Sequence, residues 1–325
     1  LGMRDVYVVG EAILTRLKDA TEEIGLPIGL KGVQDLTGPL LPGKLYVFAG
    51  SPGAGKSAIL AQVSRTIAQA GGVPALFTME MRAEEVVGRL FSADTGVSGE
   101  QIERNMLNAE EYEKLFNANQ AMKGLGFKII QAAKFSVPYI RARAMRQKKL
   151  GGLSVILIDH VHYLAKSDKR MPEFEALNEN LEWLKAMAMD LDVPVVVASQ
   201  LATEALRDLA KWPHRLPNQG DLLYSGVIDR NADVILLMHR LEVFLRRNRP
   251  TPEDKDRVDA HARRKEEVAG QVDLLLTKRR SGPGDGDRII YFDDKRVLFS
   301  DRRLKAKYAA EPTDGQRDLM AILPG

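Results

Sequence analysis

The chain has 325 residues, 45% of them hydrophobic, a formal net charge of +3, five histidines and no cysteine. This length suffices for one large α/β domain with appendages. The lack of cysteine excludes disulfides, zinc ribbons and thiol nucleophiles and fits a reducing compartment. No segment approaches the roughly 18 apolar residues of a membrane span, and the first ten residues lack the pattern of a signal peptide. We therefore expect a cytoplasmic protein without a membrane segment or a structural metal.

Residues 9–23 predict an amphipathic helix, because Ile13, Leu14 and Leu17 recur on one face and charged residues lie on the other. This helix precedes the first predicted strand and has no evident partner in its own segment. Two interpretations stay open: the helix packs on its own domain, or it packs on a neighbouring subunit.

Strands and helices alternate from residue 44 onward. The predicted strands are nearly all apolar, which is typical of strands covered on both faces, so we predict an α/β fold with a mainly parallel central sheet flanked by helices. These strands cover residues 44–49, 74–79, 127–131, 153–159, 193–199, 233–238 and 271–277, and the helices cover 57–70, 84–94, 110–123, 137–149 and 173–190.

Three segments lie outside this pattern or are rich in charge. Residues 246–269 contain Pro250 and Pro252 and predict a mobile surface loop. Basic residues cluster at 141–149, 246–265 and 278–280, which indicates either solvated faces or, if the fold supplies a channel, nucleic-acid contacts. The predicted division is a linker-helix segment at 1–28, an ATPase domain at 29–303 and a tail at 304–325.

A phosphate-binding loop follows the first strand and opens a helix. Its pattern, G-x-x-x-x-G-K-S, predicts ATP binding, because glycines let backbone N–H groups face phosphate oxygens at a helix N-terminus. In this pattern Lys56 reaches the β- and γ-phosphates and the Ser57 hydroxyl binds Mg²⁺. The loop consists of Gly50, Ser51, Pro52, Gly53, Ala54, Gly55, Lys56 and Ser57.

Polar residues end three other predicted strands, where the carboxyl edge of a parallel sheet forms the ligand crevice. Asp159 suits a magnesium shell, reached through water, although it could be an ordinary strand-end aspartate. Glu80 is a candidate base that polarises the attacking water, or alternatively the cap of the following helix. Gln200 could sense the γ-phosphate, or could simply end its strand.

Seven motifs occur along residues 29–292 in the order in which a known family has them. Through them the chain resembles the C-terminal motor domain of DnaB-type replicative helicases of bacteria and phages, within the RecA-like ATPases. The family's N-terminal helical domain has no counterpart here, so the sequence leaves open whether a longer protein contains this chain. The motifs are GPLLPG at 38–43, FTMEM at 77–81, RLFSADTGV at 89–97, IRAR at 140–143, ASQL at 198–201, DLLYSG at 221–226 with residues 231–233, and KRRSGP at 278–283.

The resemblance implies a role for each matching residue. Glu80 would be the catalytic base, Asp159 the Walker B acid, and Gln200 the residue that couples the γ-phosphate to the DNA loops. Lys278 and Arg280 would reach the ATP of a neighbouring subunit, with Arg280 as an arginine finger. The helix at 9–23 would occupy the place of the family's linker helix.

The resemblance also implies a ring, by family a hexamer, that moves 5′→3′ on single-stranded DNA, with a primase and a helicase loader as partners. Arg207, Ser225 and Gly226 would contact the DNA backbone. In this loop the chain has Leu223 and Tyr224 where the family has arginine and an acidic residue. After Asp159 it has His160 in place of tyrosine, for which we expect a packing or hydrogen-bonding role.

Two other functions remain compatible with the same P-loop. One is a RecA-like recombinase that forms filaments, which the linker-type helix and the K-x-R hairpin disfavour. The other is an ATP-gated DNA-binding loader accessory that does not unwind DNA, which an intact Glu80 and Arg280 disfavour.

Overall fold

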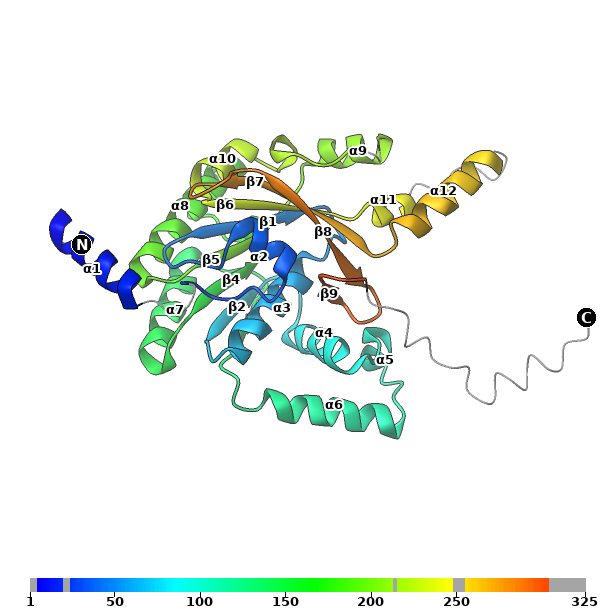
Figure 1. Cartoon of the computed structure of the whole chain (residues 1–325), viewed down its shortest axis with the longest axis horizontal. Helices are drawn as coiled ribbons and strands as arrows, with labels where there is room; N and C mark the ends of the chain where they lie inside the picture. Colours follow the sequence, from blue (N-terminus) through cyan, green and yellow to red (C-terminus); the bar gives the residue numbers. More distant parts are fainter. Residues whose placement is uncertain (1–4, 20–23, 213–214, 248–254, 304–325) are drawn as a thin grey trace, which may run out of the picture.

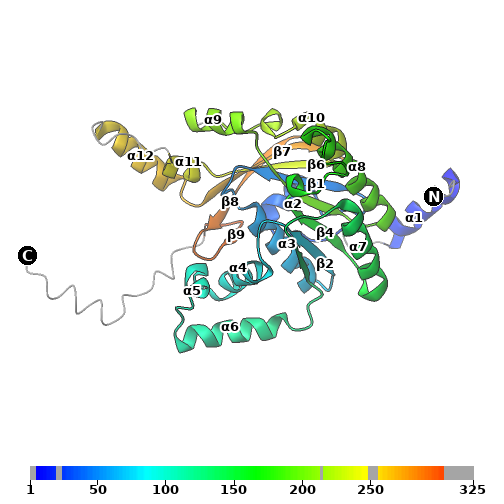
Figure 2. The ribbon, with the colours of Figure 1, turned by 180° about the vertical axis from the view of Figure 1, so that it is seen from behind.

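A nine-stranded sheet lies at the centre of the part of the chain that the computed structural model describes, residues 5–19, 24–212, 215–247 and 255–303. Helices cover both faces of this sheet (Figures 1 and 2). The strands are β1 Leu45–Gly50, β2 Pro74–Thr78, β3 Lys128–Gln131, β4 Val155–Asp159, β5 Val195–Gln200, β6 Val234–His239, β7 Gln271–Arg279, β8 Gly286–Asp293 and β9 Leu298–Ser300.

The five helices predicted after residue 44 (α3, α4, α6, α7 and α8) begin and end within two residues of the predicted positions. The described residues form the helices α1 Val6–Asp19, α2 Lys31–Thr37, α3 Lys56–Gln69, α4 Ala83–Thr95, α5 Gly99–Glu103, α6 Ala109–Met122, α7 Val137–Gly151, α8 Glu173–Leu191, α9 Thr203–Lys211, α10 Ser225–Asn231, α11 Leu241–Arg247 and α12 Lys255–Glu267, with short 3-10 turns η1 Val161–Tyr163 and η2 Gln219–Asp221.

The sheet is mainly parallel, as predicted. Its order is β3-β2-β4-β5-β1-β6-β7-β8-β9. The strands from β3 to β6 are joined by parallel pairings, and β7, β8 and β9 extend the sheet antiparallel. This RecA-like arrangement brings the carboxyl ends of the first six strands to one edge.

Strand β1 shows why these residues form a central strand. All of its residues are buried. Leu45, Val47 and Ala49 pack into the core on one face of the sheet, whereas Tyr46 and Phe48 pack into the core on the other. The two-residue period of a strand thus places apolar side chains in both helical layers.

The prediction of a mobile loop at 246–269 is wrong for the residues that are described. This segment contains the end of α11 and the whole of α12, which project together from the body of the molecule (Figure 1). Leu241, Leu245 and Val268 form a small core between the two helices. The charge density of α12 concealed this packing, because only a few apolar residues hold the helix pair. Pro250 and Pro252 lie outside the described residues.

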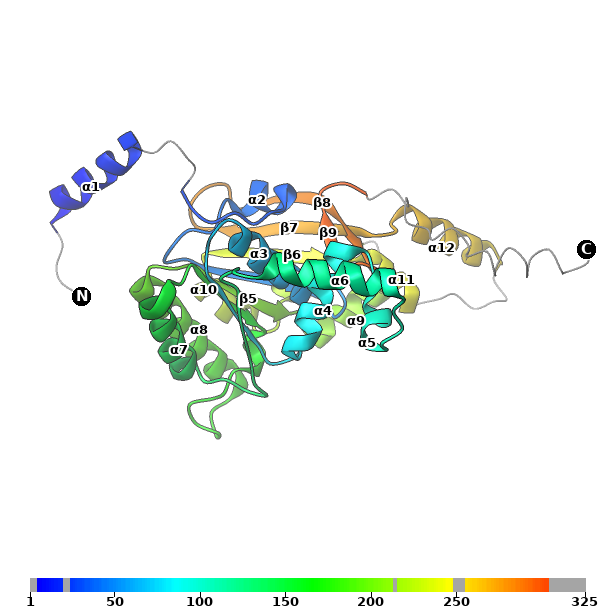
Figure 3. The same ribbon diagram turned by 90° about the horizontal axis from the view of Figure 1, so that it is seen from below.

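Helix α1 starts earlier than predicted, at Val6, and ends at Asp19, while residues 20–23 of the predicted helix lie outside the described range. It lies apart from the sheet and the helices around it (Figures 1 and 3). Val6, Tyr7 and Leu14 are 87%, 73% and 62% exposed. The helix therefore presents apolar side chains to solvent in this single chain, and of its two interpretations packing on its own domain is not observed. The predicted tail at 304–325 lies outside the described residues.

No helix among the described residues combines the length and apolar character needed to cross a membrane.

Candidate active site

The predicted site residues gather where four strand ends meet. Gly50, the last residue of β1, is aligned with Gln200 on β5 and with Met238 on β6. Thr78, the last residue of β2, is aligned with Asp159 on β4. Parallel pairing therefore brings the phosphate loop, the loop of Glu80 and the ends of β4 and β5 to one crevice.

Glycines give the phosphate loop a shape that other residues would resist. Gly53 and Gly55 have positive φ angles of 83° and 94°. A Cβ atom at Gly55 would lie 2.5 Å from the Phe299 ring, and one at Gly50 would lie 2.4 Å from the carbonyl oxygen of Met238. Helix α3 begins directly after Gly55. The loop is thus a concave backbone cradle at a helix N-terminus, which favours a bound phosphate.

Lys56 lies in the cradle rather than in solvent. Its Nζ donates hydrogen bonds to the carbonyl oxygens of Gly50 and Ser51, both at 3.0 Å. Burial lowers the pKa of Lys56, and the nearby carboxylates of Asp159 and Glu80 partly oppose this shift. The two carbonyl oxygens are neutral acceptors, and a phosphate anion in their place would form a stronger, charge-assisted hydrogen bond with Lys56.

Asp159 has the environment expected of a residue that supports a cation. It is 3% exposed, it is hydrogen-bonded to Ser57, and burial raises the pKa of its carboxyl group. Within the described residues its Oδ1 has no hydrogen-bond partner. A buried carboxylate oxygen without a partner, next to a hydroxyl group, fits the oxygen ligands that Mg²⁺ prefers.

Glu80 faces the same crevice. It is exposed and lines a cavity of about 380 Å³ together with Lys56, Ser57 and Gln200. The alternative role as a helix cap is not observed, since α4 begins at Ala83 after Arg82, with no side-chain cap. Glu80 is therefore free to contact a molecule bound in the cavity.

Sequence reasoning missed Arg89, which lines this cavity from α4. Burial lowers its pKa, and the carboxylates of Asp159, Glu85 and Glu80 oppose that shift. The resemblance placed Arg89 in a family motif without a role. Only the three-dimensional approach of α4 to the phosphate loop shows that this cation faces the site.

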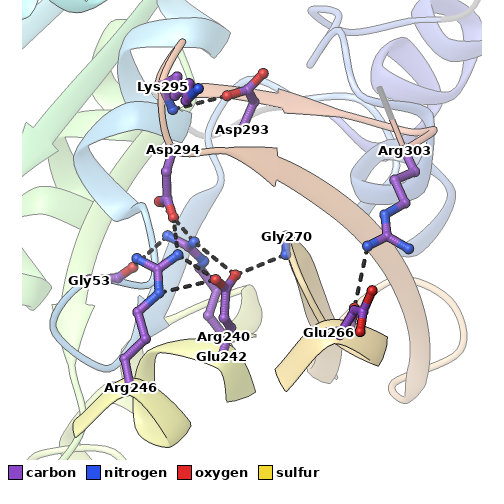
Figure 4. Close-up of polar contacts among 10 residues, drawn as sticks. All are labelled: Gly53, Arg240, Glu242, Arg246, Glu266, Gly270, Asp293, Asp294, Lys295 and Arg303. Carbon is purple, nitrogen blue, oxygen red and sulfur yellow. Dashed lines mark hydrogen bonds and ion pairs between the residues drawn. The ribbon is translucent and has the colours of Figure 1, made fainter. Parts of the chain in front are cut away.

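Arg240 and Phe292 form the other end of the cavity and were also missed. The Arg240 guanidinium is 3% exposed and lies 4.5 Å from the centre of the Phe292 ring. It donates to the carbonyl oxygen of Gly53 at 3.1 Å and to Asp294 at 2.9 Å (Figure 4). A buried arginine thus fixes the tip of the phosphate loop to the turn after β8.

Glu242 and Arg246 extend this network to the projecting helices (Figure 4). Arg246 is paired with both Glu242 and Asp294, and the buried Glu242 accepts a hydrogen bond from the Gly270 backbone at 2.9 Å. The α11–α12 pair is therefore attached to the phosphate loop through charged side chains as well as through its small core.

Gln200 links the crevice to the predicted DNA loop. Its Nε2 lies 2.9 Å from Nε2 of His160, and its carbonyl oxygen accepts a hydrogen bond from Leu223 at 3.1 Å. Burial lowers the pKa of His160 to about 3, so its ring is neutral and can accept the Gln200 proton. The expected hydrogen-bonding role of His160 is thus confirmed.

Arg280 and Lys278 do not join the site of their own chain. Arg280 lies 3.4 Å from Asp233, and Lys278 lies 3.1 Å from Asp229. Asp233 accepts from the backbone N–H of Leu45, the first residue of β1, whereas the phosphate loop follows its last residue. The length of β1, about 17 Å for five residue steps, separates Arg280 from the loop.

Arg207, Ser225 and Gly226 do not line the cavity. Arg207 is an exposed residue of α9, and Ser225 and Gly226 open α10. An antiparallel bridge between Leu201 and Leu222 joins the two segments. All three residues therefore lie in the segments that follow strand β5, which ends at Gln200.

The family model described as the DnaB-like helicase C terminal domain matches residues 25–301. The protein named Replicative DNA helicase DnaB of Rickettsia bellii is 27% identical over 314 residues, covering 91% of this chain and 61% of that protein. Its counterpart in Leifsonia xyli is 27% identical over 260 residues, covering 80% and 52%. The chain thus spans between half and two thirds of the length of these relatives.

Two solved structures are similar in fold. An ATPase domain has a TM-score of 0.79 at 22% identity, covering 93% of this chain and all of that one. A DnaB-like replicative helicase, reported with its interactions with primase, has a TM-score of 0.74 at 22% identity, covering 93% of this chain and 68% of that one.

Removing single groups separates nucleotide binding from turnover. Glu80→Gln keeps the size of the side chain and loses only the charge, so we expect ATP to bind while hydrolysis falls at least about a hundredfold. Lys56→Ala removes the phosphate contact, so we expect binding itself to be lost. Binding of a fluorescent ATP analogue and steady-state phosphate release distinguish the two. Wild-type turnover by Glu80→Gln would mean that another group is the base.

Proposed function

The chain belongs to the family of DnaB-like helicase C-terminal domains, and we propose that it is the motor of a replicative DNA helicase. In this proposal a ring of subunits hydrolyses ATP at subunit interfaces and moves 5′→3′ along single-stranded DNA. The ring is a hexamer, it acts in the cytoplasm, and a primase and a loader are its partners.

The observation that carries the proposal is the position of the predicted site residues at opposite ends of strand β1. The phosphate loop, Asp159 and Glu80 lie at the carboxyl edge of the sheet, and Arg280 lies at the opposite end of β1. If Arg280 completes the site, it must therefore act on the ATP of a neighbouring subunit. Such a trans arginine makes hydrolysis depend on assembly.

Each residue of the site has a definite task in this proposal. Lys56 and the backbone of the loop would hold the phosphates, while Ser57 and, through water, Asp159 would hold Mg²⁺. When bound, the ion would supply positive charge that offsets the negative charge of the phosphates. Glu80 polarises the attacking water, and Arg280 of the adjacent subunit, with Lys278, neutralises the charge that develops on the transferred group.

Gln200 supports coupling between hydrolysis and DNA movement. Its side chain faces the cavity and its backbone holds Leu223, two residues before Ser225. A change in the amide contacts on phosphate loss can therefore move the segment that carries Ser225 and Gly226. Backbone N–H groups and small side chains there, together with Arg207, suit contact with DNA phosphates independent of base sequence.

The two other functions are less well supported. A filament-forming recombinase would share the phosphate loop, but the family match and the separate α1 favour a ring. A loader accessory that does not unwind DNA would have no need of Glu80 in the cavity. Electron microscopy separates rings from filaments, and strand displacement separates a motor from an accessory.

A forked duplex tests the proposed activity. We expect ATP-dependent strand separation when the loading strand has a 5′ single-stranded tail and little when only a 3′ tail is present, since the motor moves 5′→3′. Arg280→Ala serves as the matched control that binds ATP without effective turnover. Separation that depends on a 3′ tail would reverse the proposed direction. DNA-stimulated hydrolysis without separation would favour the accessory function.

Helix α1 is proposed to pack on a neighbouring subunit, because it exposes Tyr7 and Leu14 in the single chain. We expect Tyr7→Ser with Leu14→Ser to leave the melting temperature of the domain unchanged but to reduce the mass of the assembly. Multi-angle light scattering measures that mass. An unchanged oligomer would show that α1 does not contribute to the subunit interface.

A further inference from the structure

A second groove lies between helix α7 and β3, the end strand of the sheet. Its volume is about 300 Å³. Its floor is apolar: Ala75 and Phe77 belong to the core beneath α7, and the partly buried Ile130 packs against that core. Leu150, 71% exposed, lies at one end. Neither the phosphate loop nor the predicted DNA segment contributes a residue to it.

Three cations line the groove: Lys128 from β3 and Arg143 and Arg146 from α7. Within the part of the chain that the structure describes, no acidic residue lines the groove and no ion pair engages these three side chains. Arg143 lies against the Tyr139 ring at 5.9 Å, which neutralises no charge. The groove is therefore a positively charged site above an apolar floor.

The basic cluster at 141–149 divides into two kinds of residue. Arg141 is paired with Asp190 at 2.9 Å, and Lys148 donates to the carbonyl oxygen of Leu191, so these two fasten α7 to α8. Arg143 and Arg146 point instead to the groove. Both arginines are exposed, as a solvated face predicts, and they also line the same groove one helical turn apart.

Strand β3 adds an unpaired backbone edge. Among the described strands it is the last of the sheet on this side and pairs with β2 alone. The N–H of Ala132 donates to the carbonyl oxygen of Thr78. The backbone N–H and C=O groups of even-numbered residues here therefore point to β2, and those of Ile129 point to the open edge. An open edge is a template for a further strand.

We propose that this groove binds an extended acidic peptide of a partner protein, which adds a strand to β3. In that arrangement alternate side chains turn toward α7, where glutamates meet Arg143, Arg146 and Lys128 while their methylene groups cover the apolar floor. The remaining side chains lie on the other face beside Ile129, and apolar residues suit them.

Nucleic acid fits the groove less well. Phosphates would find the cations but would leave the apolar floor and the strand edge without partners, and the residues that line the groove include no exposed aromatic ring on which bases could stack. A peptide strand uses all three features at once.

A labelled peptide of alternating glutamate and valine tests the site by fluorescence anisotropy. We expect saturable binding to the wild-type chain and at least a tenfold weaker affinity for Arg143→Glu/Arg146→Glu. Lys123→Glu/Lys169→Glu, which changes the net charge equally at exposed positions away from the groove, should bind as the wild type does. Unchanged ATPase activity and melting temperature of the groove variant show that it is folded and keep this test separate from the helicase proposal.

Two further probes decide between occupants. A peptide with the same sequence and methylated backbone nitrogens should bind weakly, because it cannot pair with β3. Equal binding of both peptides, or equal affinity of the two protein variants, overturns the proposal. Displacement of the peptide by oligothymidylate, with loss of oligothymidylate binding in the groove variant, would make the groove a nucleic-acid surface instead.

Discussion

The length of strand β1 is the constraint on which the rest of the structure depends. The phosphate loop follows its last residue, Gly50, and the Asp233 carboxylate binds the backbone of its first residue, Leu45. Arg280 is held at that first end by Asp233. The strand is rigid because both faces are buried, so no local motion brings this arginine to the phosphate loop of its own chain. A catalytic role for it requires a second subunit.

Burial disfavours the charged forms of two residues in the candidate active site. Lys56 and Asp159 are both largely buried. Burial lowers the pKa of Lys56 and raises the pKa of Asp159, and the attraction between the two charges opposes both shifts. An anion at the loop and a cation at Asp159 would relieve both shifts. Arg240, whose buried guanidinium binds Gly53 and Asp294, adds a further cation beside the loop. The fold thus keeps buried charged groups near the phosphate loop, and a bound ligand of opposite charge would stabilise their charged forms.

Sequence alone predicted the parallel sheet and the crevice well, because both follow from strong local patterns. Apolar runs identify strands covered on both faces, and the polar residue after each run identifies the ligand edge, which is how Glu80, Asp159 and Gln200 were selected. Arg89, Arg240 and Phe292 could not be found in this way. They come from a helix face, a strand end and an added antiparallel strand, and only the packing of α4 and β8 beside the loop brings them to the cavity.

The prediction of a loop in the charge-rich segment around α12 was wrong for a related reason. A loop and a solvated helix share a low content of apolar residues, and three apolar residues distant in sequence, Leu241, Leu245 and Val268, decide between them. The basic stretch on α7 was equally ambiguous, since it contains one paired arginine, Arg141, and two arginines that line a groove, Arg143 and Arg146. Contacts between segments, rather than composition, determine the outcome in both cases.

Mixing two inactive variants measures most directly whether the active site is completed across an interface. Arg280→Ala retains a sound phosphate loop and Lys56→Ala retains a sound arginine, and each alone should be nearly inactive, since loss of an arginine finger typically lowers the rate ~10³–10⁵-fold. After subunit exchange, confirmed by mass, the account predicts that ATPase activity with single-stranded DNA recovers well above the average of the two. Activity no higher than that average would contradict it, because Arg280 would then not act on a neighbour's ATP.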